Sequence, residues 1–305
     1  MRDFVRGYTK ATKEKVRNVK MGNQLDEMKQ SDKLINRFLL RGNKFVDYAC
    51  FQYGAYNMAI SGKANASYIS DFQYFVFVKS TKSLRSIRTL LDMGNVEDVF
   101  ILLRTMFEGY LASRFIDENY DDHLLGDFIF IPQQIARRKI IYQNEKAINR
   151  ETKELVEYIQ RNPSQMKLGK DRSYFCDFYA YLCNYAHCNF SIIPCYLNDM
   201  GMFSLNERIN EYMARVLVLF VYTRIFESIV TVEGEDFLDL REENECYQLV
   251  RDANKFLYDK LTYFSTYESK DANKELNRHM KNMFKAMKKS LKEEIGSVKK
   301  EFLND

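Results

Sequence analysis

The sequence YISDFQYFVFVKSTKSLRSIRTLLDMGNVEDVFILLRTMFEGYLASRF, residues 68–115, decides the expected fold. Its apolar residues recur at the three- and four-residue spacing of a helix on both sides of a short break. At the break, Gly94 suits the left-handed position just past a helix end, and Asn95 suits the N-cap of the next helix. Glu97 and Asp98 then occupy a first turn, where acidic groups favour the helix dipole. The stretch therefore predicts a helical hairpin.

Composition extends this prediction to the whole chain. The 305 residues contain only 3 Pro and 12 Gly, too few to separate the many short strands of a sandwich or barrel. The predicted class is all-α, with an exposed helix or partly ordered arm at residues 9–28. Further helices are predicted at about 32–60, 123–143, 145–161, 171–187, 206–233, 236–266 and 271–300. We group them into an N-terminal helical arm (1–62), a helical core (63–235) and a C-terminal helical extension (236–305).

Several classes of protein and site are disfavoured by what the sequence lacks. No apolar run reaches the roughly eighteen residues of a membrane span, and the N-terminus lacks the apolar core of a secretory signal. We therefore expect a cytoplasmic protein that does not enter a membrane. A Gly-rich phosphate loop, a dinucleotide fingerprint, a His-Glu-x-x-His motif and a nucleophile elbow are all missing, so no cofactor is predicted.

Two charged residues interrupt the second helix of the hairpin, in LLRTMFEGYL (102–111). Arg104 and Glu108 are four residues apart and share a face of a helix that is otherwise apolar almost all round, which predicts a central, buried helix. An ion pair removed from water is costly unless its hydrogen-bonding groups are satisfied. One interpretation is a structural salt bridge between helices. The other is an anion site, where the guanidinium binds a phosphate and the carboxylate orients it.

A second polar feature is a stripe along the aromatic helix SYFCDFYAYLCNYAHCNF, residues 173–190. The stripe contains Tyr174, Asp177, Tyr181, Asn184 and His187. A histidine on such a helix is either a satisfied core residue or a general acid or base near neutral pH. If the stripe faces Arg104, one cavity would combine a phosphate-binding cation with a proton-transfer group. That combination suits metal-free cleavage of RNA, in which the 2′-hydroxyl attacks its own phosphate.

A metal site near His187 is the weaker interpretation. Cys176, Cys183, Cys188 and Cys195 surround it, at intervals of seven, five and seven residues. Structural zinc sites use much shorter cysteine spacings, and two of these cysteines share a helical face as ordinary small core residues would. No metal is predicted.

The arginine helix LLRTMFEGYL and the helix that closes in NYAHCNF together resemble a bacterial family of uncharacterised all-α proteins, a divergent branch of the HEPN superfamily. The resemblance covers roughly residues 68–235. Members of that superfamily include toxin and antiphage-defence ribonucleases, and dimers are typical of them. The resemblance implies a HEPN-like helical bundle with added N- and C-terminal helices. The site residues that it implies are Arg104, Glu108 and His187, with Asn184 and Tyr185 nearby.

One departure from the HEPN pattern bears on activity. The usual signature places an arginine four to six residues before a histidine on one helix, whereas Arg104 and His187 lie on different predicted helices. The resemblance implies a metal-independent ribonuclease in which Arg104 holds the phosphate, His187 transfers protons and Glu108 positions Arg104, whereas the departure from the signature counts against catalysis. The alternative is a non-enzymatic helical protein that binds a partner or senses a ligand, in which the same polar residues are structural.

Both ends of the chain are basic. Residues 1–44 carry 12 basic and 5 acidic side chains, and residues 270–305 carry 10 and 6. In the predicted C-terminal helix, Lys281, Lys285 and Lys288 lie on the side opposite an apolar stripe. The helix either docks with a solvated lysine face or guides RNA, or another partner, to the protein.

Overall fold

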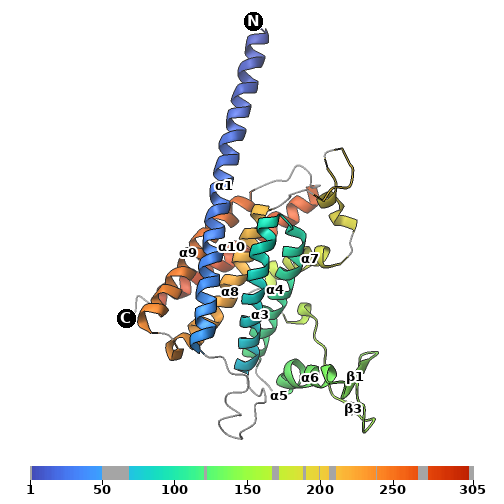
Figure 1. Ribbon diagram of the computed structural model, residues 1–305. Coiled ribbons are helices and arrows are strands. Elements are labelled where there is room, and N and C mark those ends of the chain that lie inside the picture. The colour runs from blue at the N-terminus through green and yellow to red at the C-terminus, as the bar shows by residue number, and fades with distance from the viewer. Residues whose placement is uncertain are drawn as a thin grey trace.

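The computed structural model describes residues 2–49, 69–119, 122–166, 172–187, 190–198, 200–205, 211–237, 239–266 and 274–301, and these form a mainly helical protein with one small antiparallel sheet (Figure 1). The elements are α1 (Arg2–Ala49), α3 (Ile69–Met93), α4 (Val96–Glu118), α5 (Asp122–Leu125), the π-helical turn η1 (Gly126–Phe130), α6 (Ile131–Ala136), β1 (Ile140–Gln143), β2 (Lys146–Asn149), β3 (Leu155–Val156), the 3-10 turn η2 (Pro163–Gln165), α7 (Arg172–Ala186), the 3-10 turn η3 (Phe190–Tyr196), α8 (Glu211–Phe237), α9 (Leu240–Phe264) and α10 (Lys274–Glu301).

The predicted hairpin is confirmed as α3 and α4, which pack against each other. Gly94 has a φ of 79°, the left-handed conformation that glycine adopts without strain. The N–H of Asn95 donates to the carbonyl of Leu90 at 3.0 Å, which satisfies one of the last carbonyls of α3. Asn95 occupies the N-cap position of α4, but its side chain makes no capping hydrogen bond. Backbone geometry therefore makes the turn.

Helix α8 is the centre of the bundle. Every residue from 212 to 226 is buried, so this helix meets protein on all sides. It packs against α1, α3, α4 and α9. Helix α4 is also largely enclosed, by α3, α7 and α8, but it leaves one face open at Arg104. No helix in the described part of the chain has both the length and the apolar character needed to cross a bilayer.

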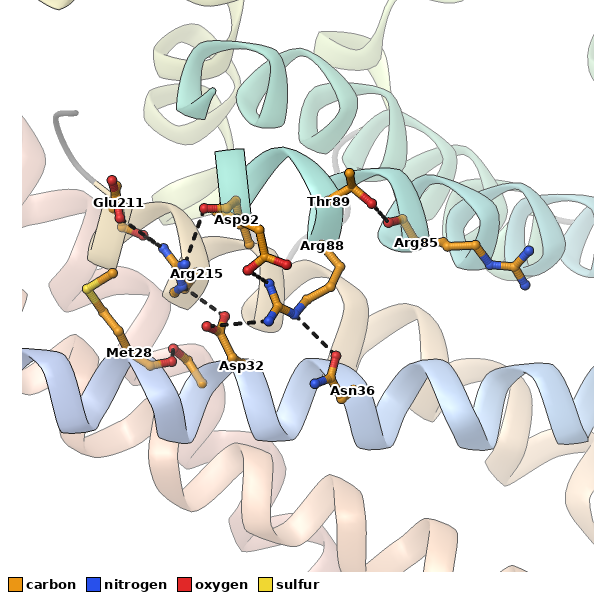
Figure 2. A network of polar contacts seen from close by, with 11 residues as sticks. Met28, Asp32, Asn36, Arg85, Arg88, Thr89, Asp92, Glu211 and Arg215 are labelled. Atoms are coloured by element: carbon orange, nitrogen blue, oxygen red, sulfur yellow. Dashed lines mark hydrogen bonds and ion pairs between the residues drawn. The ribbon is translucent and has the colours of Figure 1, made fainter. Parts of the chain in front are cut away.

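The N-terminal region is one continuous helix to Ala49, longer than the predicted helix at 32–60, whose last residues lie outside the described part of the chain. Its first half extends beyond the bundle (Figure 1). A polar network fastens its second half to α3 and α8 (Figure 2). At its centre, the buried Arg215 of α8 donates to Asp32 of α1 at 2.8 Å.

The helices predicted at 171–187, 206–233, 236–266 and 271–300 correspond to α7, α8, α9 and α10. The apolar stripe predicted for α10 is buried at Phe284, Met287 and Leu291. One hydrophobic cluster contains residues from all three predicted segments, among them Phe38, Phe107 and Phe284. The division at residues 62 and 235 stays a prediction.

Residues 123–161 do not form the two helices that the sequence predicted. A helix was predicted for 123–143, but helical structure stops at Ala136, and the helix predicted for 145–161 is wrong. Strands β1 and β2 instead form an antiparallel hairpin in which Ile141 pairs with Ile148. Its two turn residues, Asn144 and Glu145, have φ of 50° and 62°, as a two-residue hairpin turn requires. Asn144 was the local signal for this turn, because asparagine tolerates that conformation.

Candidate functional site

Arg104 and Glu108 form the predicted ion pair on α4. Arg104 Nε lies 3.0 Å from Glu108 Oε1, and the two side chains are 22% and 32% exposed. The surrounding residues of the helix, including Leu103, Met106 and Phe107, are buried in the core. The pair is therefore only partly solvated and sits at the edge of the apolar interior.

Tyr179 of α7 completes a triangle with this pair. Arg104 Nη2 donates to Tyr179 Oη at 3.0 Å, and Tyr179 Oη donates to Glu108 Oε1 at 2.9 Å. The Tyr179 ring stacks on Phe175, with centroids 6.1 Å apart and planes 5° apart. Three side chains from two helices thus hold one another in position, which fixes the direction of the Arg104 guanidinium.

At neutral pH, both Tyr179 and Arg104 are protonated and can donate hydrogen bonds. Burial raises the pKa of Tyr179 to about 12, and its hydrogen bond to the Glu108 carboxylate acts in the same direction, against the opposing effect of Arg104. For Arg104, burial lowers the pKa, but the hydrogen bond with Tyr179 and the charge of Glu108 outweigh it and raise the pKa overall. Tyr179 therefore stays a neutral phenol and Arg104 stays a cation.

The triangle borders a cleft of about 370 Å³. The cleft lies between α3, α4, α7 and the segment that leads into η2. Its charged residues are Lys79 of α3, Arg104 and Glu108 of α4, and Arg161 of the segment before η2. Three cations thus face one carboxylate. Hydroxyl and amide groups of Ser83, Thr105 and Asn162 add hydrogen-bonding capacity, and Phe72, Val76 and Met166 supply apolar surface.

Arg161 reaches this cleft from a different part of the chain. Its Nη2 lies 3.6 Å from Asp127 Oδ2, and its guanidinium lies over the Phe115 ring at 5.5 Å. Its Nε is buried and has no hydrogen-bond acceptor among the described residues. Arg104 Nε is in the same situation, because it approaches Glu108 without the alignment of a hydrogen bond. Two buried arginine N–H groups beside this cleft therefore lack an aligned acceptor, although Arg104 Nε keeps its charge contact with Glu108.

His187 is not brought to the cleft. It is exposed, it follows the last residue of α7, and its N–H donates to the carbonyl of Cys183 at 3.3 Å. Because it comes eight residues after Tyr179, it lies roughly 12 Å farther along the helix axis. His187 is not among the residues that line the cleft. A catalytic role for His187 stays a prediction.

The other predicted residues of α7 lie along its length without lining the cleft. Tyr181 and Tyr185 contact each other through their hydroxyls at 3.2 Å, and both rings pack against Phe100, with centroids 5.5 Å and 4.5 Å away. Burial raises the pKa of Tyr181 well above its ordinary value. Asp177 is exposed and Asn184 is half-buried. The stripe therefore meets α4 at Phe100, one turn before Arg104.

The predicted lysines of α10 belong to a different surface. Lys285 is exposed, Lys281 is half-buried, and Lys288 lies 4.7 Å above the ring of Tyr258 on α9. None of the three lines the cleft. Their role as RNA contacts stays a prediction.

Sequence reasoning missed Tyr179, Arg161 and Lys79. Tyr179 is one of many tyrosines on α7 and lies off the polar stripe, so its place beside Arg104 follows only from how α4 and α7 pack. These helices are antiparallel, since Phe107 contacts Phe178 while Phe100 contacts Tyr185. The only local signal for Arg161 was its position before the Asn162-Pro163 break.

A family model described as "Family of unknown function (DUF5677)" matches residues 74–200. The match contains α4, α7 and the segment between them, so all four charged residues of the cleft fall within it. Neither curated proteins nor solved structures gave a match. Among the described residues, no group of three or more His, Cys, Asp or Glu side chains is placed to hold a metal ion.

Proposed function

We propose that this protein binds a phosphate-bearing ligand, a nucleotide or an RNA segment, in the cleft beside Arg104. The observation that carries the proposal is the gathering of Lys79, Arg104 and Arg161 at one cleft, where Arg104 is held in position by Glu108 and Tyr179. A phosphate offers several acceptor oxygens and matches the planar fork of a guanidinium. A phosphate bound at Nη1 of Arg104 would therefore form a charge-assisted contact that neither Glu108 nor Tyr179 takes up.

The charges of the cleft support the same ligand class. Among the described residues that line the cleft, Lys79, Arg104 and Arg161 are cations and Glu108 is a carboxylate, while Asp127 pairs with Arg161 at 3.6 Å, so one positive charge is in excess. Glu108 and Tyr179 contact Arg104 through Nε and Nη2, which leaves Nη1 for a ligand. The hydroxyl and amide groups nearby suit a sugar, and the apolar residues suit a base or another flat group.

A HEPN-like, metal-independent ribonuclease is the second candidate. It is favoured by the orientation of Arg104, because a carboxylate and a neutral phenol hold this cation where it could bind a scissile phosphate. The position of His187, roughly two turns of helix beyond Tyr179 and outside the cleft, favours ligand binding over cleavage at this site. The antiphage or toxin context, the dimer and the partner protein that the HEPN resemblance implies stay predictions with it.

Calorimetric titration with inorganic phosphate and with the dinucleotide UpA tests the binding proposal. We expect wild-type protein to bind both, and Arg104→Gln to weaken binding at least tenfold, since a charge-assisted contact typically contributes about 1.5–3 kcal/mol. The matched control is Arg114→Gln. Arg114 lies on the same helix, contacts the Tyr110 hydroxyl at 3.0 Å and approaches Glu118 Oε1 at 3.5 Å, but does not line the cleft. Equal weakening by both variants, or no binding by wild-type protein, would overturn the proposal.

Cleavage is tested separately with a fluorescent 20-nucleotide RNA in the presence of a chelator. The proteins compared are wild type, Arg104→Gln and His187→Ala, each checked for folding by circular dichroism. If wild-type protein cleaves the RNA and both variants do not, the result supports the ribonuclease proposal. If none of the three proteins cleaves RNAs of varied sequence, the ribonuclease proposal is excluded and the ligand-binding proposal stands.

A further inference from the structure

The segment between α5 and η2 forms a lobe that projects from the helical bundle (Figure 1). We call residues 131–156 the basic lobe; it contains α6, β1, β2 and β3. It carries six basic side chains and three acidic ones, Glu145, Glu151 and Glu154. This concentration of positive charge is separate from the basic chain ends, and neither the cleft nor the fold accounts for it.

Two cations of the basic lobe are placed directly opposite each other. Ile140 pairs with Asn149 in the β1–β2 ladder, and the N–H of Arg150 donates to the carbonyl of Lys139 at 2.9 Å. Lys139 and Arg150 are therefore cross-strand neighbours, and both are exposed. Like charges in this position destabilise a sheet. The arrangement is unfavourable for the free protein and becomes favourable when an anion lies between the two side chains.

A third cation is held in a strained backbone conformation. Arg138 has a φ of 58°, in the left-handed region that residues other than glycine, asparagine and aspartate rarely adopt. Its backbone N–H donates to the carbonyl of Ile135 at 2.9 Å, so the conformation is part of the turn from α6 into β1. The turn presents Arg137, Arg138 and Lys139 as three consecutive exposed cations.

These cations have no acidic partners among the described residues. No ion pair joins Arg137, Arg138, Lys139, Arg150 or Lys153 to any carboxylate in that part of the chain. Elsewhere in the protein, arginines commonly pair with a nearby carboxylate, as Arg88 does with Asp92 and Arg241 with Glu245. The basic lobe therefore presents uncompensated charge, which is the footprint of a polyanion-binding surface.

The basic lobe is anchored at the rim of the cleft. The chain runs from β3 directly into Gln160, Arg161 and Asn162, which line the cleft. Just before them, the N–H of Ile159 donates to Asp127 Oδ1 at 3.1 Å, and the same carboxylate approaches Arg161. The positive charge of the lobe and that of the cleft are thus joined by a short, tethered segment.

We propose that the basic lobe binds the phosphate backbone of a single-stranded nucleic acid, one phosphate of which occupies the Arg104 cleft. This inference rests on the proposed function of the cleft and specifies its ligand as a polymer. A backbone of regularly repeated phosphates matches cations spread over a lobe and a cleft. Contacts to the phosphate backbone carry no sequence information, so the binding has little sequence preference.

The test measures fluorescence anisotropy of a labelled 20-nucleotide oligouridylate over a series of salt concentrations. The lobe variant is Lys139→Gln/Arg150→Gln, and the control is Arg251→Gln/Lys255→Gln, which removes two exposed charges from α9. We expect the lobe variant to bind at least about tenfold more weakly at low salt. Its slope of log affinity against log salt falls by about 1.4, since each phosphate contact contributes about 0.7 for a single strand. The control binds as wild type does.

A second measurement separates this inference from the proposed function. UpA has a single phosphate, which the cleft holds, so we expect the lobe variant to bind UpA as wild type does, whereas Arg104→Gln does not. If the lobe variant binds the 20-mer as tightly as wild type while Arg104→Gln loses UpA, the lobe inference is wrong and the cleft proposal stands.

A third probe distinguishes nucleic acid from an acidic protein partner. Poly-glutamate of similar length carries comparable charge without phosphates. If Lys139→Gln/Arg150→Gln weakens binding of poly-glutamate but leaves the 20-mer unaffected, the lobe recognises acidic peptides and the inference is overturned. If Lys285→Gln on α10 weakens the 20-mer and the lobe variant does not, the nucleic-acid surface is α10 and the inference is again overturned.

Discussion

Arg215 and Arg104 are both arginines inside apolar helices, but their surroundings differ. Arg215 is 4% exposed and has acceptors on three sides: Asp32 at 2.8 Å, the carbonyl of Glu211 at 3.2 Å and the carbonyl of Leu91 at 3.4 Å (Figure 2). Arg104 is 22% exposed, borders a cleft and has a buried Nε with no aligned acceptor. A buried arginine with an acceptor at each of its three nitrogens joins helices, whereas one that keeps a nitrogen unused at a cleft is suited to a ligand.

This comparison also separates two uses of an ion pair. The Asp32–Arg215 pair links α1 to α8, two helices far apart in the sequence, and Asp32 extends the network to Arg88 of α3 at 3.8 Å. The Arg104–Glu108 pair lies within one helix, so it does little to hold the fold together. Its partner on α7 is a neutral phenol, which orients the arginine without cancelling its charge.

The largest effect is expected for Asp32→Ala. It removes the carboxylate that lies 2.8 Å from the buried Arg215 and leaves Glu211 Oε2, at 3.6 Å from Nη1, as the remaining carboxylate partner. We therefore expect a loss of about 3 kcal/mol, the low end of the range for breaking a buried pair. Urea denaturation measures the change in the free energy of unfolding. The control is Asp26→Ala, because Asp26 belongs to a pair with Lys29 in which both side chains are 78% exposed. If the free energy of unfolding falls no more than it does in the control, the Asp32–Arg215 pair does not stabilise the packing of α1 on α8.

A smaller loss of stability, below about 1 kcal/mol, is expected for Arg104→Gln, since the substitution relieves a partly buried charge and leaves the core intact. Its main effect should be on ligand binding, which we expect to fall at least tenfold. Thermal unfolding and titration with UpA measure the two quantities on one sample. A large loss of stability with unchanged binding would reverse the comparison and make Arg104 the structural residue.

Tyr179→Phe removes the hydroxyl that links Arg104 to Glu108 and keeps the ring that stacks on Phe175. One hydrogen bond of this kind contributes about 1 kcal/mol, so we expect UpA to bind about fivefold more weakly with only a slight change in unfolding temperature. If the phenol merely fills space, affinity should match that of wild type. Tyr158→Phe, in the segment next to the cleft, is the tyrosine control.

The smallest effect is expected in the alkaline range. Because the pKa of Tyr179 is raised to about 12 in the folded protein from an ordinary value of 10, folding favours its protonated form. Its contribution to stability is complete below pH 10 and is lost as the pH rises from 10 towards 12. Subtracting the ultraviolet titration curve of Tyr179→Phe from that of wild type should give one phenol with a midpoint near 12. A midpoint near 10 would mean that the triangle does not constrain Tyr179.

Part of the fold was predictable from the sequence because it depends on local rules. The α3–α4 hairpin follows from Gly94 and Asn95 between two periodic apolar segments, and α7 to α10 follow from the same periodicity. The β-hairpin was missed because its strands are only four residues long, too short for a strand alternation to be distinguished from helical spacing. The turn at Asn144 was the stronger signal, since a positive φ is a local backbone requirement.

The candidate site was half predictable for a related reason. The spacing of Arg104 and Glu108 places them on one helical face in any fold that contains α4. The residues that complete the site come from elsewhere: Tyr179 lies 71 positions after Glu108, and Arg161 belongs to a segment without regular structure. His187 was chosen for its chemistry, but the axial rise of α7 carries it past the cleft.

By itself, the sequence determined the predominantly helical class, the α3–α4 hairpin and the charged pair within α4, because periodicity, capping and four-residue spacing act between neighbours along the chain. Only the tertiary structure decided which arginine is structural and which one faces a cleft. That outcome depends on which acceptors are delivered by distant helices: Asp32 and Leu91 surround Arg215, whereas Arg104 meets one phenol and an open space lined with other cations.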